Sequence, residues 1–256
     1  RFSYSNPNLQ QIPARHGILG PLIRSIFIPE KDCKWGIFDY SQQEPRLVVH
    51  YANKNGFPGA GKFLDSYQKD NTTDFHTMVS EIADIPRKQA KTINLGLFYG
   101  MGKGKLMSQL GVSEEEATEL LQSYHEKVPF VKKLTYDTQG IANKNGFLTT
   151  IQGRRCRFDL WESELEWGKK ALPEEEAGRE YGKKTIKRAW TYKALNKLIQ
   201  GSAADQIKTA MIHLHREGYV SHIQVHDELD FSVASDADKN KIKEIMETCL
   251  PKLEVP

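Results

Sequence analysis

Two aspartates that are far apart in the sequence each stand where an expected strand ends. Asp39 closes the apolar run of residues 35–40, which is typical of a buried strand, and Asp227 lies between the expected strands 222–225 and 229–233. If these strands end at one edge of a sheet, the two carboxylates can hold hard divalent cations. Two metal ions about 3.5–4 Å apart would activate an attacking oxygen and stabilise a leaving one. Taken singly, either aspartate is more simply a turn or helix-cap residue.

A second group of residues has helical spacing. Arg87, Lys91, Leu95 and Tyr99 follow Pro86 at intervals of four, so they lie along one slowly turning stripe of a helix. Such a helix presents two cations and then an aromatic ring to one elongated ligand, and a nucleoside triphosphate fits this arrangement. From spacing alone, a solvated basic face followed by a core tyrosine is the simpler explanation.

Composition places few limits on function. The 256 residues are 39% hydrophobic and 27% charged, with a net charge of +3, which describes a globular protein and permits nucleic-acid binding without requiring it. No run approaches the roughly 18 apolar residues of a membrane span, and Cys33, Cys156 and Cys249 lack zinc-site spacing. A cytoplasmic protein is therefore expected, and the start without methionine indicates a fragment or a processed chain.

The elements that must position these residues form an α+β pattern, with strands at both ends around a helical insert. Helices are expected at about residues 44–52, 86–99 and 187–215, across most of residues 62–126, and from Asp236 onward. A capping box joins Ser113 to Glu116, and a hairpin spans residues 147–158 with its turn at Gly153. The charged residues 162–188 are expected to form a solvated insertion.

Segments along nearly the whole chain resemble, in the correct order, the motifs of the DNA polymerase I family, family A. Residues 39–46 resemble DYSQIELR, residues 225–229 match VHDEL, and residues 87–100 resemble RxxxKxxxFGxxYG. Further similar segments are residues 5–13 (SxxPNLQNIP), 153–155 (the GRR of TxxGRR) and 196–205 (NxxxQGTAAD).

The resemblance implies a right-hand polymerase fold, with an antiparallel-sheet palm and an inserted, mostly helical fingers subdomain. The palm would comprise residues 1–54 and 147–256, with a charged insertion at 161–190, and the fingers residues 55–146. The thumb and any proofreading exonuclease would precede Arg1. The length of the insertion and the Gln43–Pro45 variant favour a phage or viral type.

The implied activity is DNA-directed DNA synthesis, in which a primer 3′-oxygen attacks a deoxynucleoside triphosphate and pyrophosphate leaves. Asp39, Asp227 and the Tyr40 carbonyl would bind two Mg²⁺ ions, for which Mn²⁺ could substitute. Glu228 would support them, and Lys91 would protonate the leaving group. The residues implied to contact the nucleotide are Arg87, Lys91, His76, Glu44, Tyr99, Leu95 and Gln43. Those implied to contact DNA are Arg1, Asn8, Gln10, Arg154, Arg155, Asn196, Gln200 and His226.

Some positions depart from the family pattern. Leu95 replaces the usual Phe or Tyr, Tyr192 replaces an Arg, and Gln43 and Pro45 replace Ile and Leu. A single-subunit RNA polymerase shares the two aspartates and the basic helix, but Glu44 matches the residue that excludes ribonucleotides. A nucleic-acid-binding fragment without activity in isolation is the non-enzymatic alternative. The expected partners are primer–template DNA, deoxynucleoside triphosphates and the rest of a longer, monomeric protein.

Overall fold

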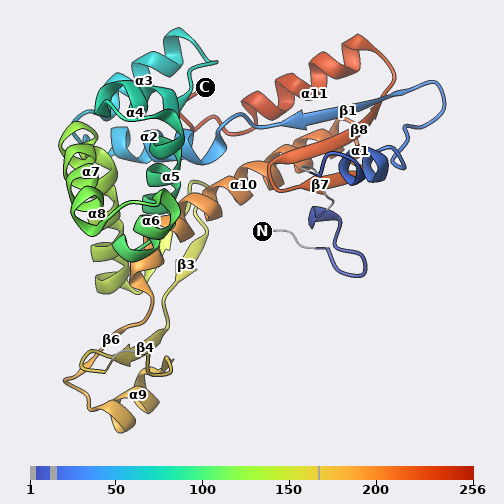
Figure 1. Cartoon of the computed structure of the whole chain (residues 1–256). Coiled ribbons are helices and arrows are strands. Elements are labelled where there is room, and N and C mark those ends of the chain that lie inside the picture. The colour runs from blue at the N-terminus through green and yellow to red at the C-terminus, as the bar shows by residue number, and fades with distance from the viewer. Residues whose placement is uncertain (1–3, 12–15, 167) are drawn as a thin grey trace. The chain divides into compact units, whose positions relative to one another are not determined.

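The computed structural model describes residues 4–11, 16–166 and 168–256 (Figure 1). It divides into two compact units: residues 1–43 with 203–253, which we call the sheet unit, and residues 44–202 with 254–256, the helical unit. This division by packing uses other boundaries than the palm–fingers–palm division expected from the sequence, which stays a prediction. Among the described residues, no helix combines the length and the apolar character needed to cross a bilayer.

The sheet unit is built on three antiparallel strands in the order β1 (Lys34–Asp39), β8 (Glu228–Val233), β7 (Ile223–Val225). Leu229, Phe231 and Val233 of β8 are buried, and β8 contacts α11 (Asp236–Thr248). The helix begins at Asp236 as predicted. The expectation that β1 is buried is wrong, because among the described strands β1 lies at the edge of the sheet and pairs with β8 alone, and Ile37 is 51% exposed. Ahead of β1 lie the 3₁₀ turn η1 (Leu9–Gln11) and the short helix α1 (Leu19–Arg24).

Consecutive helices make up the first part of the helical unit. They are α2 (Gln43–Lys54), α3 (Ala60–Lys69), α4 (Phe75–Ala83), α5 (Arg87–Phe98), α6 (Lys103–Leu110), α7 (Glu114–Lys127) and α8 (Pro129–Asn145). The ring of Phe63 packs against Phe75 and Phe130, with centroids 5.1 Å apart in both pairs. The predicted capping box of Ser113 and Glu116 is present at the start of α7. The predicted helical character of residues 62–126 is confirmed.

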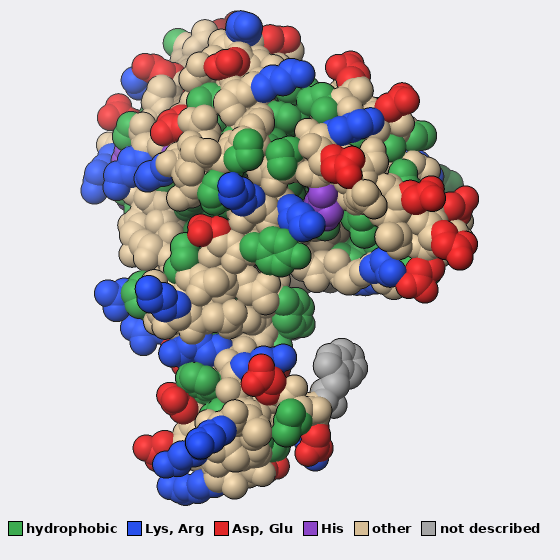
Figure 2. All heavy atoms as spheres, turned by 90° about the vertical axis from the view of Figure 1, so that its left-hand side faces the viewer, with side chains coloured by type: hydrophobic (Ala, Val, Ile, Leu, Met, Phe, Trp, Pro, Cys, Tyr) green, Lys and Arg blue, Asp and Glu red, His purple; other side chains and the backbone are tan. Residues whose placement is uncertain are grey.

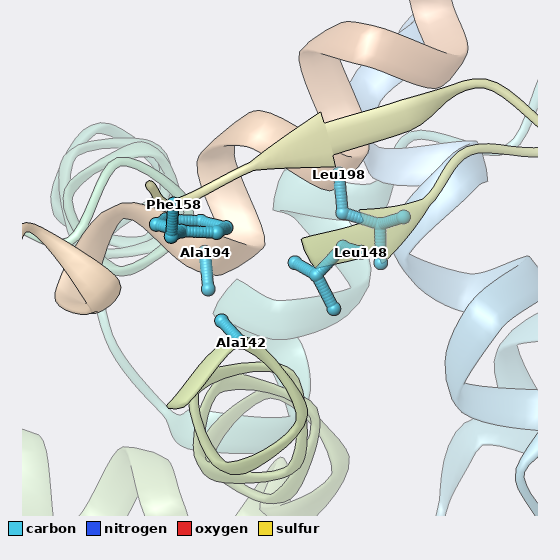
Figure 3. Packing of buried hydrophobic residues seen from close by; sticks show 5 residues of the cluster. All are labelled: Ala142, Leu148, Phe158, Ala194 and Leu198. Carbon is cyan, nitrogen blue, oxygen red and sulfur yellow. The ribbon is translucent and has the colours of Figure 1, made fainter. Parts of the chain in front are cut away.

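The hairpin of β2 (Phe147–Thr149) and β3 (Arg155–Arg157) follows α8, as predicted. It packs with α8 and the first turns of α10 (Ala194–Arg216) around a small apolar cluster, whose side chains converge in Figure 3. The cluster contains Ala142, Leu148, Phe158, Ala194 and Leu198.

The charged insertion is a folded module. Strands β5 (Leu172–Pro173), β4 (Leu160–Ser163) and β6 (Ile186–Arg188) form an antiparallel sheet beside α9 (Glu174–Tyr181). Arg188 lies 4.7 Å over the Trp161 ring and donates to the carbonyl oxygens of Asn143 and Phe158 at 3.1 and 3.0 Å. Lys and Arg side chains are interspersed with Asp and Glu over the face shown in Figure 2.

The helix expected from residue 187 instead begins at Ala194. Lys187 and Arg188 are paired with Glu162 and Trp161 in the sheet, and the 3₁₀ turn η2 (Thr191–Lys193) follows. Strand pairing therefore overrides the helical propensity of this segment.

Candidate active site

The two aspartates singled out in the sequence lie together at one end of the sheet. Asp39 is the last residue of β1 and stands opposite Glu228 in the register with β8. The N–H of Tyr40 donates to the carbonyl oxygen of Asp227 at 3.3 Å, which fixes the end of β1 to the β7–β8 turn. In that two-residue turn His226 has φ 55°, a left-handed conformation that costs a non-glycine residue stability. We call residues 39–40 and 226–228 the acidic turn.

Several carboxyl groups in and beside the acidic turn have raised pKa values. Burial and, second, the negative charge of Asp227 raise the pKa of Asp39 to about 6. Burial also raises the pKa of Glu228, with Arg24 opposing the shift and Asp39 adding to it. Further along β8, burial and Glu228 raise the pKa of Asp230 to about 6. Carboxylates crowded in this way repel one another when ionised, and a bound cation would remove that repulsion.

The donor atoms of the acidic turn fit a hard divalent cation. They are carboxylate and main-chain carbonyl oxygens, the ligand types that Mg²⁺ prefers. Across residues 4–11, 16–166 and 168–256, no three His, Cys, Asp or Glu side chains cluster so as to enclose a metal ion by themselves. Mg²⁺ is usually bound by one or two carboxylates together with water and substrate phosphates, so a pair of aspartates suits it.

The sequence that leads into the sheet is tied to the acidic turn by Gln224 of β7. Gln10 donates to Gln224 Oε1 at 3.0 Å, and Gln224 Nε2 donates to the His226 carbonyl at 2.5 Å. Asn8 accepts from the N–H of Gln10 at 3.1 Å. Gln224 is 4% exposed, and no pattern in the sequence had singled it out. Arg1, expected to contact DNA, lies outside the described residues.

In the helical unit, the two expected phosphate-binding cations lie in the first two turns of α5. Arg87 donates to Asp74 Oδ2 at 2.7 Å and to Thr77 Oγ1 at 3.1 Å, and Lys91 is exposed. Asp74 also caps α4 by accepting from the N–H of Thr77 at 2.7 Å. Burial raises the pKa of Asp74, but the hydrogen bonds from Arg87 and Thr77 outweigh it and lower the pKa to about 2. Asp74 therefore orients the guanidinium of Arg87.

A buried hydrogen-bond chain runs from α7 through α5 to α4. The hydroxyl of Tyr124 donates to Asn94 Oδ1 at 2.5 Å, and Asn94 Nδ2 lies 2.9 Å from His76 Nδ1. Tyr124 and Asn94 are fully buried, and His76 is 6% exposed. An amide nitrogen can only donate, so His76 Nδ1 accepts and the neutral ring carries its proton on Nε2. The reverse orientation of Asn94 would make the amide the donor to Tyr124 and would remove the acceptor of the phenol proton.

Burial lowers the pKa of His76 to about 4, with Asp74 raising it and Lys91 and Arg87 lowering it. At neutral pH His76 therefore offers a ligand an N–H group and no positive charge. The sequence pointed to His76 but missed Asn94 and Tyr124. The one available signal was a polar residue in α5 one turn from the apolar Ala90, Leu97 and Phe98.

The end of α5 is joined to the first turn of α2. The Tyr99 hydroxyl donates to Glu44 Oε2 at 2.7 Å, and Tyr99 is 39% exposed. Gln43, expected at the nucleotide, is 7% exposed, and its amide donates to the Ala203 carbonyl at 3.3 Å and to Gln206 Oε1 at 3.0 Å. These bonds give its side chain a packing role. Leu95 is half-buried.

The basic hairpin and α10 are held closely together. Arg154 Nη2 donates to the Gly201 carbonyl at 2.8 Å, and a Cβ on Gly201 would lie 2.8 Å from Thr150 Cγ2, so the approach requires glycine. Arg154 and Arg155 are exposed on the hairpin. The other two residues expected to contact DNA, Asn196 and Gln200, lie one turn apart on α10 and are half-buried.

Comparison with known proteins gives a consistent result. The family model for DNA polymerase family A matches residues 1–256. A DNA-directed DNA polymerase of Pseudomonas phage M6 is 37% identical, over 100% of this chain and 41% of that protein. DNA polymerase I of Bacillus subtilis (strain 168) is 33% identical, over 99% of this chain and 27% of that protein.

A solved structure, the POL domain of Pol1 from M. smegmatis in complex with DNA primer-template and dNTP, matches with a TM-score of 0.76 and 29% identity. The match covers 100% of this chain and 44% of that one. The mixed helical and antiparallel-sheet fold, with the expected palm and fingers arrangement, is thereby confirmed. The chain spans less than half the length of these relatives. With its family model matched from end to end, the chain belongs to DNA polymerase family A.

Proposed function

We propose that this chain carries the catalytic centre of a DNA-directed DNA polymerase, which extends a primer by template-directed transfer of deoxynucleotides. The observation that carries the proposal is the meeting of Asp39 and Asp227 at one end of the sheet, where burial and mutual repulsion raise the pKa of Asp39 to about 6. A membrane or purely structural role gives no reason to hold two carboxylates this close together.

The metal ligands would be the carboxylates of Asp39 and Asp227 and the carbonyl of Tyr40, with Glu228 in support. Two Mg²⁺ ions, or Mn²⁺ in their place, would supply an activated primer 3′-oxygen and a stabilised pyrophosphate leaving group when bound. The hydroxyl of Tyr40 donates to the Met246 carbonyl at 2.7 Å, which anchors the backbone beside Asp39. This hydrogen bond would help to hold the proposed oxygen ligands in place.

The nucleotide would be bound by the start and the end of α5. Arg87 and Lys91 suit the triphosphate, and His76 can add a neutral Nε2–H donor. Lys91, which is exposed on α5, would protonate departing pyrophosphate. The hydrogen bond from Tyr99 holds the carboxylate of Glu44, which we propose to crowd the sugar 2′ position and exclude ribonucleotides.

The primer–template duplex would be contacted by Arg154 and Arg155 of the hairpin and by Asn196 and Gln200 of α10. His226 would lie at the primer terminus. In the longer protein, a thumb and a proofreading domain would complete a monomeric, cytoplasmic polymerase.

Single-nucleotide primer extension in Mg²⁺ tests this proposal. Asp227→Ala should abolish extension, whereas Asp137→Ala, at an exposed position of α8, should leave it unchanged. Glu44→Ala should increase ribonucleotide use relative to deoxynucleotide use. Extension by Asp227→Ala at the wild-type rate would contradict the proposed mechanism, and equal use of both sugars by the unmodified chain would favour an RNA polymerase.

A further inference from the structure

Two exposed aromatic side chains lie near a lysine in the turn that precedes α10. Trp190 and Tyr192 are 41% and 48% exposed. Nζ of Lys193 lies 5.9 Å from the centroid of the Trp190 ring and 5.4 Å from that of Tyr192. Thr191, between them, is buried and anchors the loop. We call Trp190, Tyr192 and Lys193 the aromatic platform.

The backbone of the aromatic platform is strained. Trp190 has φ 59° and ψ 22°, in the left-handed region that glycine and asparagine adopt far more readily than a bulky residue. Burial of the Trp190 ring does not fully offset the cost of this conformation, since two-fifths of the residue remains exposed. Strained residues of this kind cluster at ligand-binding positions, where the side chain is kept for function.

The aromatic platform is packed against the end of α5. Gly100, which directly follows Tyr99, has φ 68°, and a Cβ on it would lie 2.7 Å from the carbonyl oxygen of Tyr192 and 3.5 Å from Cδ2 of its ring. Any larger residue would push the loop away. The loop is thus held beside the turn that presents Tyr99, within the same compact unit.

Resting on the proposed function, we propose that the aromatic platform stacks an unpaired base of the template strand, with Lys193 on an adjoining phosphate. Aromatic rings beside a cation suit single-stranded nucleic acid, because every base offers a π-face and every linkage a negative charge. An apolar peptide partner would gain little here, because the ammonium group of Lys193 lies within 6 Å of both ring centroids.

The test measures binding of the full chain to a primer–template by fluorescence anisotropy. One template has a 5′ single-stranded extension of normal nucleotides, and the other carries abasic sites in the same extension, which keeps every phosphate. The wild-type chain should bind the normal extension about fivefold or more tightly, the lower range for stacking of one base. Trp190→Asn/Tyr192→Ala should bind both templates equally.

The variant also separates function from folding. Asparagine tolerates the left-handed conformation, so the melting temperature of Trp190→Asn should equal or exceed that of the wild type while base-dependent binding is lost. Tyr136→Ala is the matched control, because Tyr136 is 64% exposed on α8 with Lys132 Nζ 6.0 Å from its ring centroid, and it should keep the preference.

The proposal that the aromatic platform stacks a template base would be overturned by either of two results. One is a wild-type chain that binds both templates equally, and the other is a double variant that still binds the normal extension more tightly. Primer extension by the same wild-type sample shows separately whether the proposed polymerase function holds. Primer synthesis by a chain that shows no preference for the normal template counts against base stacking by the aromatic platform alone. Primer synthesis by Asp227→Ala at the wild-type rate counts against the proposed polymerase centre.

Discussion

The buried hydrogen bond between Tyr124 and Asn94 can be removed by deleting one oxygen atom, the hydroxyl of Tyr124. Tyr124→Phe keeps the ring, which is fully buried among the helices, but leaves Asn94 Oδ1 without its donor at a position that water does not reach. An unsatisfied buried polar group costs about 1–3 kcal/mol. The free energy of unfolding should fall by that amount, which for a chain of this size lowers the melting temperature by about 2–4 °C per kcal/mol.

Whether Tyr124→Phe lowers the free energy of unfolding should depend on the presence of Asn94. In an Asn94→Leu background the phenol already lacks its acceptor, so Tyr124→Phe should be neutral or stabilising there. Urea denaturation measures both steps of this cycle, with an unchanged m-value showing that the unfolding transition is the same. Tyr136→Phe, at an exposed position of α8, should stay within about 0.5 kcal/mol of the wild type.

An equal loss of stability from Tyr124→Phe in the wild type and in Asn94→Leu would refute this reasoning. The hydrogen bond would then contribute nothing specific, and the orientation of Asn94 that places the His76 proton on Nε2 would lose its support.

Burial and the negative charge of Asp227 raise the pKa of Asp39 from its ordinary value of 3.8 to about 6, so its ionisation opposes folding as the pH rises between these values. Without metal, Asp39→Asn should therefore raise the melting temperature at pH 7 and change it little at pH 4. Calorimetry at both pH values in chelator measures this, and destabilisation at pH 7 would contradict it. Gly201→Ala should cost about 1–3 kcal/mol by overpacking against Thr150, whereas Gly140→Ala, with open space around the new Cβ on α8, should stabilise by about 0.5–1 kcal/mol; urea unfolding distinguishes the two. Leu95→Tyr should improve dideoxynucleotide incorporation by restoring a flat ring, and an unchanged discrimination ratio in primer extension would count against that.

Features set by near neighbours in the sequence were predictable. The capping box of Ser113 and Glu116, the start of α5 after Pro86 and the hairpin turn at Gly153 each depend on residues within a few positions of one another. The end of β1 at Asp39 followed in the same way from an apolar run that stops at an acid. The order of the motifs was likewise enough to identify the family.

The sequence could not show which residues meet across long separations. It missed the contact of Asn94 with Tyr124, the edge position of β1 and the strand pairing that delays the start of α10 to Ala194. Periodicity reports which face of an element is apolar, but the partner that satisfies a buried polar atom is chosen only when distant helices and strands pack. The sequence therefore determined the local elements and the reactive residue types, and the tertiary structure decided their burial, pairing and proton positions.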